Sequence, residues 1–146
     1  MKLKSVSFKS FNPDDTAELS FALIIARFEN KWIFVRHRER KSWELPGGRR
    51  EIGESILETA RRELIEETGA LNFSIKPLDV YQVLFEGQIR ETCGVLCYAE
   101  VYELGMLPPS EIAEIALVDE SPSDLTYPLV HPYLVERMRI KTEMCL

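Results

Sequence analysis

The sequence predicts an α/β domain in which a mixed β-sheet lies between two helices. Short runs of β-branched and aromatic residues, typical of strands, recur along the chain. A charged segment of helical length, residues 51–68, interrupts these runs, and an amphipathic segment, residues 132–141, follows the last of them. A chain of 146 residues can bury a sizeable core, so we expect one domain over residues 1–146.

The first half of the sheet is indicated by two apolar runs. Residues 1–8 alternate loosely, which favours a short edge strand. Residues 20–28 (SFALIIARF) are apolar without polar alternation, the pattern of a strand buried on both faces. Residues 29–31 then predict a hairpin connection to a returning strand at residues 32–36, after which the polar stretch 37–44 predicts a loop.

The charged segment is expected to form a loop, a helix and a second loop. Residues 46–48 (Pro-Gly-Gly) predict a tight turn in front of it. Residues 51–68 have the length and periodicity of a helix, with Ser55 or the pair 53–54 as alternative starting points. Gly69 suits the position that ends a helix, because glycine adopts left-handed backbone angles readily.

The second half of the chain completes the sheet. Residues 75–85 and 92–102 read as two strands, and residues 115–118 as a third, short one. Residues 132–141 predict a terminal helix that packs on the sheet through one apolar face, made of Leu134, Val135 and Met138. His131 is expected to be a helix-entry residue rather than a ligand.

Composition narrows the function classes. The net charge is −6 and the chain has no run of lysine or arginine, which argues against a binder of duplex nucleic acid or of membrane surfaces. A small phosphorylated ligand remains compatible, because bound metal can meet its charge locally. The apolar N-terminal strand could serve an edge-to-edge homodimer.

Cysteine usage and the start of the chain indicate a cytoplasmic protein. The three cysteines are odd in number, and the spacing of two in an apolar strand favours buried free thiols over a disulfide or a zinc pair; they are Cys93, Cys97 and Cys145. The first residues contain no signal-peptide core, and the longest apolar run, near residues 21–26, is too short to span a bilayer.

Three glutamates give the central helix its unusual character. At about 100° per residue, Glu63, Glu66 and Glu67 cluster on one arc of the helix beside its apolar stripe. Like charges three and four residues apart destabilise a helix, and the dipole at its C-terminal end disfavours anions further. A divalent cation would remove this cost, since Mg²⁺ prefers carboxylate, water and phosphate oxygens as ligands. A solvated acidic flank is the alternative for three glutamates alone.

The spacing of the whole segment resembles the signature of the Nudix hydrolase superfamily. That signature is G-x5-E-x7-R-E-U-x-E-E-x-G-U, where U is aliphatic, and the matching positions here are Gly48, Glu54, Arg62, Glu63, Leu64, Glu66, Glu67 and Gly69. Ala70 is a small residue for the last position. The resemblance implies a Nudix-type α-β-α sandwich with a mixed sheet and a catalytic loop–helix–loop.

The resemblance also implies the roles of these residues. Magnesium or manganese would be held by Glu63, Glu66, Glu67 and the carbonyl of Gly47. Glu54 and Arg62 would brace the loop–helix–loop through charge-assisted hydrogen bonds.

The general base is implied less clearly. Glu63 is the first choice, and a glutamate beyond the helix is the second. Glu114 lies where many family members carry such a residue, Glu111 is its competitor, and a plain loop carboxylate is an equal alternative.

The implied reaction is hydrolysis of a nucleoside diphosphate-linked compound by in-line attack of water. The segment from residue 115 to 134 resembles MutT-like proteins, which favours a nucleoside triphosphate such as 8-oxo-dGTP, cleaved to the monophosphate and pyrophosphate. A dinucleotide, a nucleotide sugar or an RNA 5′ end is the alternative substrate. A nucleotide-sensing module without activity is the alternative class, which the presence of every signature glutamate disfavours.

Residues outside the signature are candidates for contacts with the substrate. Arg36, His37 and Arg38 follow the second strand and could reach phosphates, with a solvated loop as the alternative. Trp43 and Tyr81 could stack on a base, with a place in the core as the alternative.

Overall fold

The fold is built around β2 (Phe21–Phe28), which is buried on both faces as the sequence predicts. A computed structural model describes residues 2–142 and shows β2 inside a seven-stranded sheet. The other elements are β1 (Leu3–Lys9), β3 (Lys31–His37), β4 (Gly47–Arg49), β5 (Ala70–Phe85), β6 (Thr92–Leu104), β7 (Ile112–Val118), α1 (Ile56–Thr68) and α2 (His131–Thr142).

The sheet is mixed. Its strand order is β1-β5-β6-β2-β3-β7, with β4 paired to β2 as well. The pair β2–β6 is parallel, and every other strand pair is antiparallel. The predicted edge strand at the N-terminus is β1, which pairs with the far end of β5. The predicted hairpin follows β2, where Glu29 and Asn30 adopt positive φ angles of 50° and 64°.

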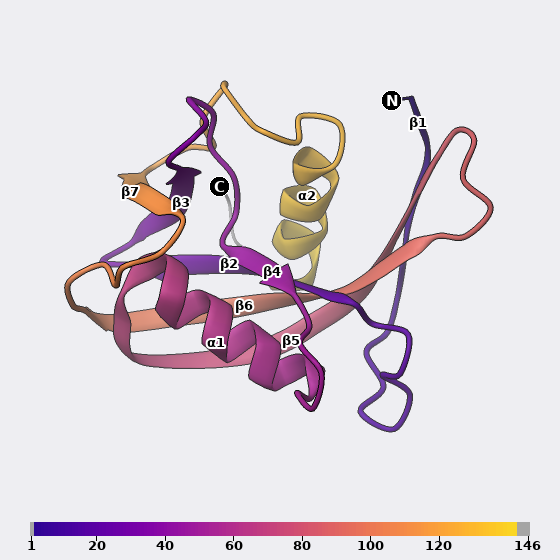
Figure 1. Cartoon of the computed structure of the whole chain (residues 1–146), viewed down its shortest axis with the longest axis horizontal. Coiled ribbons are helices and arrows are strands. Elements are labelled where there is room, and N and C mark those ends of the chain that lie inside the picture. The colour runs from indigo at the N-terminus through magenta and orange to yellow at the C-terminus, as the bar shows by residue number, and fades with distance from the viewer. Residues whose placement is uncertain (1, 143–146) are drawn as a thin grey trace.

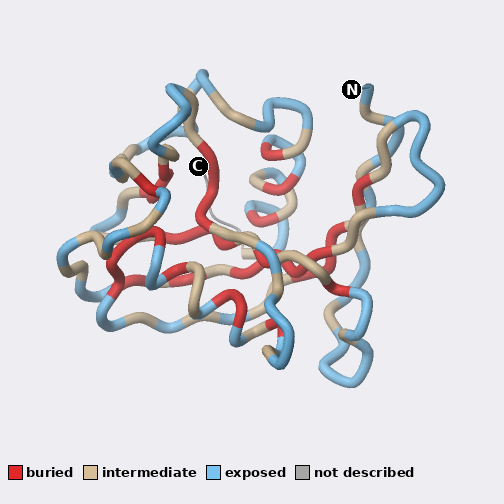
Figure 2. The backbone as a smooth tube through the Cα atoms, in the orientation of Figure 1, coloured by how far each residue is buried: buried red, intermediate tan, exposed pale blue. Residues whose placement is uncertain are grey.

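Each helix covers one face of the sheet (Figure 1). Because successive side chains of a strand point to opposite faces, Ile24 packs in a core cluster on the α1 side and Ile25 in a cluster on the α2 side. Helix α1 contributes Ala60 and Leu64 to the first cluster, and α2 contributes Leu134 to the second. Figure 2 shows these buried segments running through the centre of the sheet. The predicted α-β-α sandwich is confirmed.

Helix α1 has well-defined ends. Ser55 caps its N-terminus in a reciprocal pair with Glu58, so Ser55 was the correct alternative and the start expected at residue 51 was too early. Gly69 ends the helix with φ 78°, as the sequence predicts, and donates its N–H to the carbonyl of Ile65. The two caps thus fix the residues at which α1 begins and ends. The spacing of the glutamates along the helix then sets the side to which they point.

The tight turn expected at residues 46–48 is wrong. Gly47 and Gly48 instead extend along β2 as part of β4, opposite Leu23 and Ala22. The carbonyl of Pro46 accepts a hydrogen bond of 2.9 Å from the N–H of Ile24, so pairing with β2 holds the segment straight.

Four strands are longer than the sequence predicts. Strand β3 spans residues 31–37 rather than 32–36, β5 begins at residue 70 rather than 75, β6 ends at 104 rather than 102, and β7 begins at 112 rather than 115. Ala70 and Asn72 in the added part of β5 pair with Leu104 and Glu103 in the added part of β6, so partner strands extend segments whose own composition is less typical of strands. None of the helices in residues 2–142 is long and apolar enough to cross a membrane.

Candidate active site

Helix α1 and strand β4 meet at two glycines, and this contact places two carboxylates. The N–H of Gly47 donates to Oε1 of Glu67 at 2.9 Å. Glu63 lies over Gly48, where a Cβ atom would stand 2.4 Å from Oε1 of Glu63. The absence of a side chain at Gly48 therefore lets the Glu63 carboxylate sit against the backbone of the strand.

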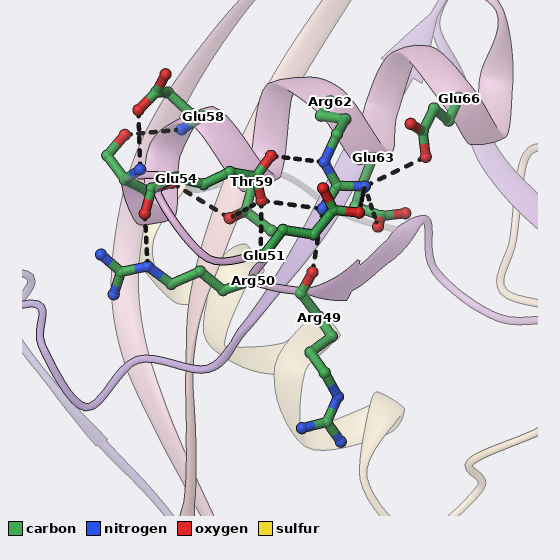
Figure 3. Close-up of polar contacts among 10 residues, drawn as sticks. Arg49, Arg50, Glu51, Glu54, Glu58, Thr59, Arg62, Glu63 and Glu66 are labelled. Atoms are coloured by element: carbon green, nitrogen blue, oxygen red, sulfur yellow. Dashed lines mark hydrogen bonds and ion pairs between the residues drawn. The ribbon is translucent and has the colours of Figure 1, made fainter.

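Arg62 connects the remaining signature residues (Figure 3). Its Nε and Nη2 atoms donate to both oxygens of Glu54, at 2.6 and 3.0 Å. Its Nη1 atom donates to Glu63 at 2.8 Å and to Glu66 at 3.2 Å. Nη2 also donates to the carbonyl of Arg49 at 3.1 Å. Arg62 and Glu54 thus join helix, preceding loop and strand β4, the bracing role that the resemblance implies.

Two further residues support Glu54, and sequence reasoning missed both. Arg50 donates from Nε to the carbonyl of Glu54 at 2.8 Å and from Nη1 to the carbonyl of Thr16 at 2.9 Å. Thr59 donates its hydroxyl to Oε1 of Glu54 at 2.9 Å. Hydrogen bonds from Arg62, first of all, lower the pKa of Glu54 to about 2. No sequence signal separates Arg50 from its neighbour Arg49, because both follow the glycines.

Burial changes the acidity of the two carboxylates that α1 holds against β4. Removal from water raises the pKa of Glu67 to about 8, against the hydrogen bond from Gly47, and the negative charges of Glu63, Glu44 and Glu111 raise it further. Burial also raises the pKa of Glu63, and its bond to Arg62 opposes that rise. The side chains of Glu67 and Glu63 are only 9% and 13% exposed, so these two carboxyl groups are largely desolvated.

His37, the last residue of β3, and Glu44, from the loop that follows, complete this side of the site. His37 lies with Nε2 2.8 Å from Oε1 of Glu44 and 3.7 Å from Oε2 of Glu67. Glu44 is buried and also accepts from Nη1 of Arg40 at 2.9 Å. Sequence reasoning missed Glu44, whose only signal is its place four residues before Gly48 in an otherwise polar loop.

Of the two glutamates considered beyond the helix, Glu111 is the one close to the site. Its Oε2 atom lies 3.8 Å from Nδ1 of His37, and its charge acts on Glu67. Glu114 instead accepts from Nε of Arg36 at 2.8 Å, because the register of β3 and β7 places these two residues opposite each other. The geometry therefore favours the competitor Glu111 over Glu114.

Two of the residues expected to contact substrate, Arg36 and Arg38, hold the loop after β3. Arg36 donates from Nη1 to the carbonyl of Arg40 at 2.7 Å, and Arg38 donates from Nε to the carbonyl of Ser110 at 3.0 Å. Arg38 also lines a hollow of about 290 Å³ beside His37. Trp43 packs in the α2-side core, which is the alternative that the sequence left open.

An apolar pocket of about 340 Å³ opens beside the glycines of β4. It is walled mainly by aromatic and aliphatic side chains, with a few polar groups. Its lining residues are Phe21, Leu23, Glu44, Leu45, Gly47, Gly48, Tyr81, Val83, Phe85, Thr92, Tyr127, Val130 and His131. Tyr81, a candidate from the sequence, is buried in this wall, and the guanidinium of Arg49 stacks 4.7 Å over the ring of Phe21.

The oxygen donors of the site suit a hard divalent cation. Glu63 and Glu67 offer desolvated carboxylates at the strand, and Glu66, half-exposed, follows on the same side of α1. Within residues 2–142, no three side chains of the metal-binding types are already grouped as a metal centre. In this arrangement the hydrogen bonds of Arg62 offset part of the charge of Glu63 and Glu66.

The family of this chain follows from its match to a known family model. A family model described as the NUDIX domain matches residues 16–132, which contain β4, α1 and most of the sheet. The chain belongs to the Nudix family. Nudix hydrolases generally use divalent metals, in agreement with the acidic donors of α1. The resemblance stated from the sequence is thus confirmed, and the loop–helix–loop is the Nudix signature segment.

Relatives and solved structures agree with this assignment. The protein named "Putative 8-oxo-dGTP diphosphatase YtkD" of Bacillus subtilis strain 168 is 46% identical over 81 residues, which are 56% of this chain and 49% of that protein. The chain therefore matches about half the length of this curated relative. The pyrophosphohydrolase BsRppH of Bacillus subtilis has a similar structure, with a TM-score of 0.75 and 26% identity over 92% of this chain and 90% of that one.

The NUDIX domain of Shewanella oneidensis NrtR, solved with ADP ribose, shares the fold. Its TM-score is 0.67 at 19% identity, over 90% of this chain and 94% of that one.

Proposed function

We propose that this Nudix protein hydrolyses the diphosphate linkage of a nucleotide with Mg²⁺ or Mn²⁺. The observation that carries the proposal is the pair Glu63 and Glu67, two desolvated carboxylates that α1 holds against the glycines of β4. Holding two anions together away from water is costly, and a divalent cation offsets that cost. The signature spacing and family membership agree with this chemistry.

Glu63, Glu66, Glu67 and the carbonyl of Gly47 would hold the metal. When bound, it polarises phosphate oxygens and lowers the pKa of water. Arg62 keeps Glu63 beside Gly48 through its hydrogen bond, and it fixes the preceding loop through Glu54. These contacts preorganise the carboxylates before substrate arrives.

Water attacks one phosphorus of the substrate in line with the leaving phosphate, and a carboxylate oxygen takes its proton. Glu63 is the first candidate for this base, since it is buried at the strand with a raised pKa. Glu111 is the second, because it lies beside His37 at the edge of the carboxylate group. A nucleoside triphosphate and one water then yield the monophosphate and pyrophosphate.

The preferred substrate class is a nucleoside triphosphate, with 8-oxo-dGTP as the first compound to test. The apolar pocket shares Gly47 and Gly48 with the carboxylate site, so a base in the pocket leaves its phosphates near the carboxylates. The name of the 46% identical relative supports an oxidised purine, and BsRppH supports pyrophosphate release.

A phosphate-release assay with added pyrophosphatase, run over a panel of nucleotides with Mg²⁺, tests the proposal. The panel includes 8-oxo-dGTP, the common triphosphates and a triphosphorylated RNA 5′ end. It also includes ADP ribose, whose products, AMP and ribose 5-phosphate, are detected with alkaline phosphatase in place of pyrophosphatase. We expect the protein to turn over a triphosphate. Of the variants Glu63→Gln and Glu111→Gln, the one that removes the general base should lose about 10²- to 10⁴-fold in kcat. Glu91→Gln, an exposed change in the turn between β5 and β6, is the matched control.

Nucleotide binding without turnover of any panel compound would support the sensing module instead. Equal kcat values for wild type and Glu63→Gln would remove Glu63 from the reaction.

A further inference from the structure

His131 has an unexplained place in the apolar pocket. It is the first residue of α2, it is 2% exposed, and it is one of the residues that line the pocket. Its Nδ1 atom is buried and has no hydrogen-bond partner within residues 2–142. Buried polar atoms are almost always hydrogen-bonded, so an unpaired one calls for a partner that is not part of the protein.

The chain holds this histidine by contacts between two loops. The N–H of Trp43 donates to the carbonyl of Asp124, and the N–H of Thr126 donates to the carbonyl of Trp43, both at 2.8 Å. The N–H of His131 donates to the carbonyl of Tyr127 at 3.0 Å, and the two rings lie 5.3 Å apart with a tilt of 52°. The imidazole is therefore positioned by backbone pairing and not by bonds of its own side chain.

The chemistry of the ring restricts what it can bind. Burial lowers the pKa of His131 to about 4, so the imidazole is neutral at pH 7 and offers one donor and one acceptor nitrogen. A neutral ring in an apolar wall is poorly suited to phosphate, whose charge would be met by metal at the carboxylate site. A flat heteroaromatic ring with a polar edge fits both the aromatic walls and the imidazole.

We propose that His131 recognises the polar edge of the substrate's base through a ring nitrogen, and so contributes to specificity. This inference rests on the proposed function, since it assumes that a nucleotide occupies the pocket. His131 takes no part in the chemical step, because the contacts that surround Glu63 and Glu67 come from α1, β4 and the end of β3. Its loss therefore weakens base recognition and leaves the reacting groups in place.

Steady-state kinetics give the first test. His131→Phe fills the space of the ring and removes both nitrogens, so we expect KM for the best triphosphate to rise about tenfold while kcat changes by less than about threefold. His131→Asn and His131→Gln retain a donor and an acceptor, and at least one of them should recover most of the loss. Tyr133→Phe, an exposed change two residues along the same helix, is the matched control.

Nitrogen NMR of the histidine rings gives a second test that does not depend on turnover. The chain contains only two histidines, so ¹⁵N-histidine labelling yields two sets of ring signals, and His37→Gln assigns them if His131→Phe does not fold. With EDTA present, dGMP or 8-oxo-dGMP should shift the His131 ring signals as it binds. Ribose 5-phosphate, which carries the phosphate without a base, should leave them unmoved.

The outcomes separate the inference from the proposed function. If wild type turns over a triphosphate but His131→Phe leaves KM unchanged, or if dGMP binds without moving the His131 signals, the inference is wrong and the function stands. If wild type neither binds nor hydrolyses any nucleotide, the proposed function fails and the inference with it.

Discussion

Glu67 combines two properties that rarely occur together in one surface helix. It sits near the C-terminus of α1, where the dipole disfavours an anion, and its carboxylate is almost completely buried. Gly47 supplies one hydrogen bond, and nearby glutamates supply like charge. In the metal-free protein Glu67 therefore opposes folding at neutral pH and above, as expected for a residue kept for binding.

The first prediction follows from the pKa of Glu67, which lies near 4.5 in the unfolded chain and at about 8 in the folded one. Its protonated form favours folding below pH 4.5, and this contribution is lost as the pH rises through 8. Glu67→Gln keeps an acceptor for Gly47 and avoids the charge. In EDTA the variant should melt about 2 to 6 °C above wild type at pH 8 and equal to it near pH 4.5.

Thermal melts with and without Mg²⁺ complete this test. Saturating Mg²⁺ should raise the Tm of wild type at pH 8, because a ligand of the folded state stabilises it, and should raise that of Glu67→Gln much less. A pH-independent difference between the two proteins in EDTA would contradict the assigned environment of Glu67.

At the scale of elements, β4 explains why two adjacent glycines stand at the start of the signature segment. Neither glycine has a positive φ, so backbone freedom is not the reason. A Cβ atom at Gly47 would stand 2.3 Å from the carbonyl oxygen of Ala22 on β2. A Cβ atom at Gly48 would meet the carboxylate of Glu63. One glycine permits strand pairing and the other permits the approach of the helix.

The second prediction is that alanine at these two positions has different effects. Gly47→Ala collides with backbone, which cannot move aside cheaply, so it should lower the free energy of unfolding by about 1 to 3 kcal/mol. Gly48→Ala collides with the end of a side chain, which can rotate away, so stability should change by less than about 1 kcal/mol. The displaced Glu63 should then lower kcat by about 100-fold.

Urea unfolding and kinetics of both variants measure this difference. A Gly48→Ala protein with wild-type kcat would show that the position of Glu63 over β4 is not needed. Equal destabilisation by both changes would show that the Glu63 side chain cannot move away from a Cβ atom at position 48.

On the scale of the whole molecule, α2 borders the pocket and packs on the sheet through a few side chains. Leu134 and Met138 are fully buried against the sheet. Arg137 donates from Nε to Oδ2 of Asp79 on β5 at 2.5 Å, and its guanidinium lies 5.2 Å from the ring centre of Phe8 on β1. The side chain of Asp79 is completely buried, so Arg137 supplies its compensating charge and links α2 to the far part of the sheet.

The third prediction concerns this buried ion pair. Arg137→Met leaves a buried carboxylate without its partner, which should cost about 3 to 5 kcal/mol of stability. Adding Asp79→Asn to that variant removes the buried charge and should recover at least half of the loss. Arg139→Met, on the exposed side of the same helix, should cost less than about 1 kcal/mol.

Urea unfolding of wild type, Arg137→Met, Asp79→Asn and the double variant gives the coupling energy between Asp79 and Arg137. Additive effects of the two single changes would mean that Asp79 and Arg137 act independently.

Local chemistry let the sequence by itself determine the α/β class, the Nudix segment and the C-terminal end of α1, with Ser55 as one of two alternatives for its start. Caps at Ser55 and Gly69 bond to residues within four positions, and the arc of glutamates depends only on helical spacing. Such features need no distant partner. They could be predicted because every interaction that specifies them lies inside one short stretch.

Only the tertiary structure decided which distant groups join this segment. The straight form of β4 depends on β2, and the choice of Glu111 over Glu114 depends on the register of β7 against β3. The pocket that contains His131 requires the loop before α2 to pair with the loop after β3. The strand and loop pairs named here join residues 24 to 86 positions apart, from Leu23–Gly47 to Trp32–Val118. A local pattern cannot specify which of several similar side chains such pairing brings to the site.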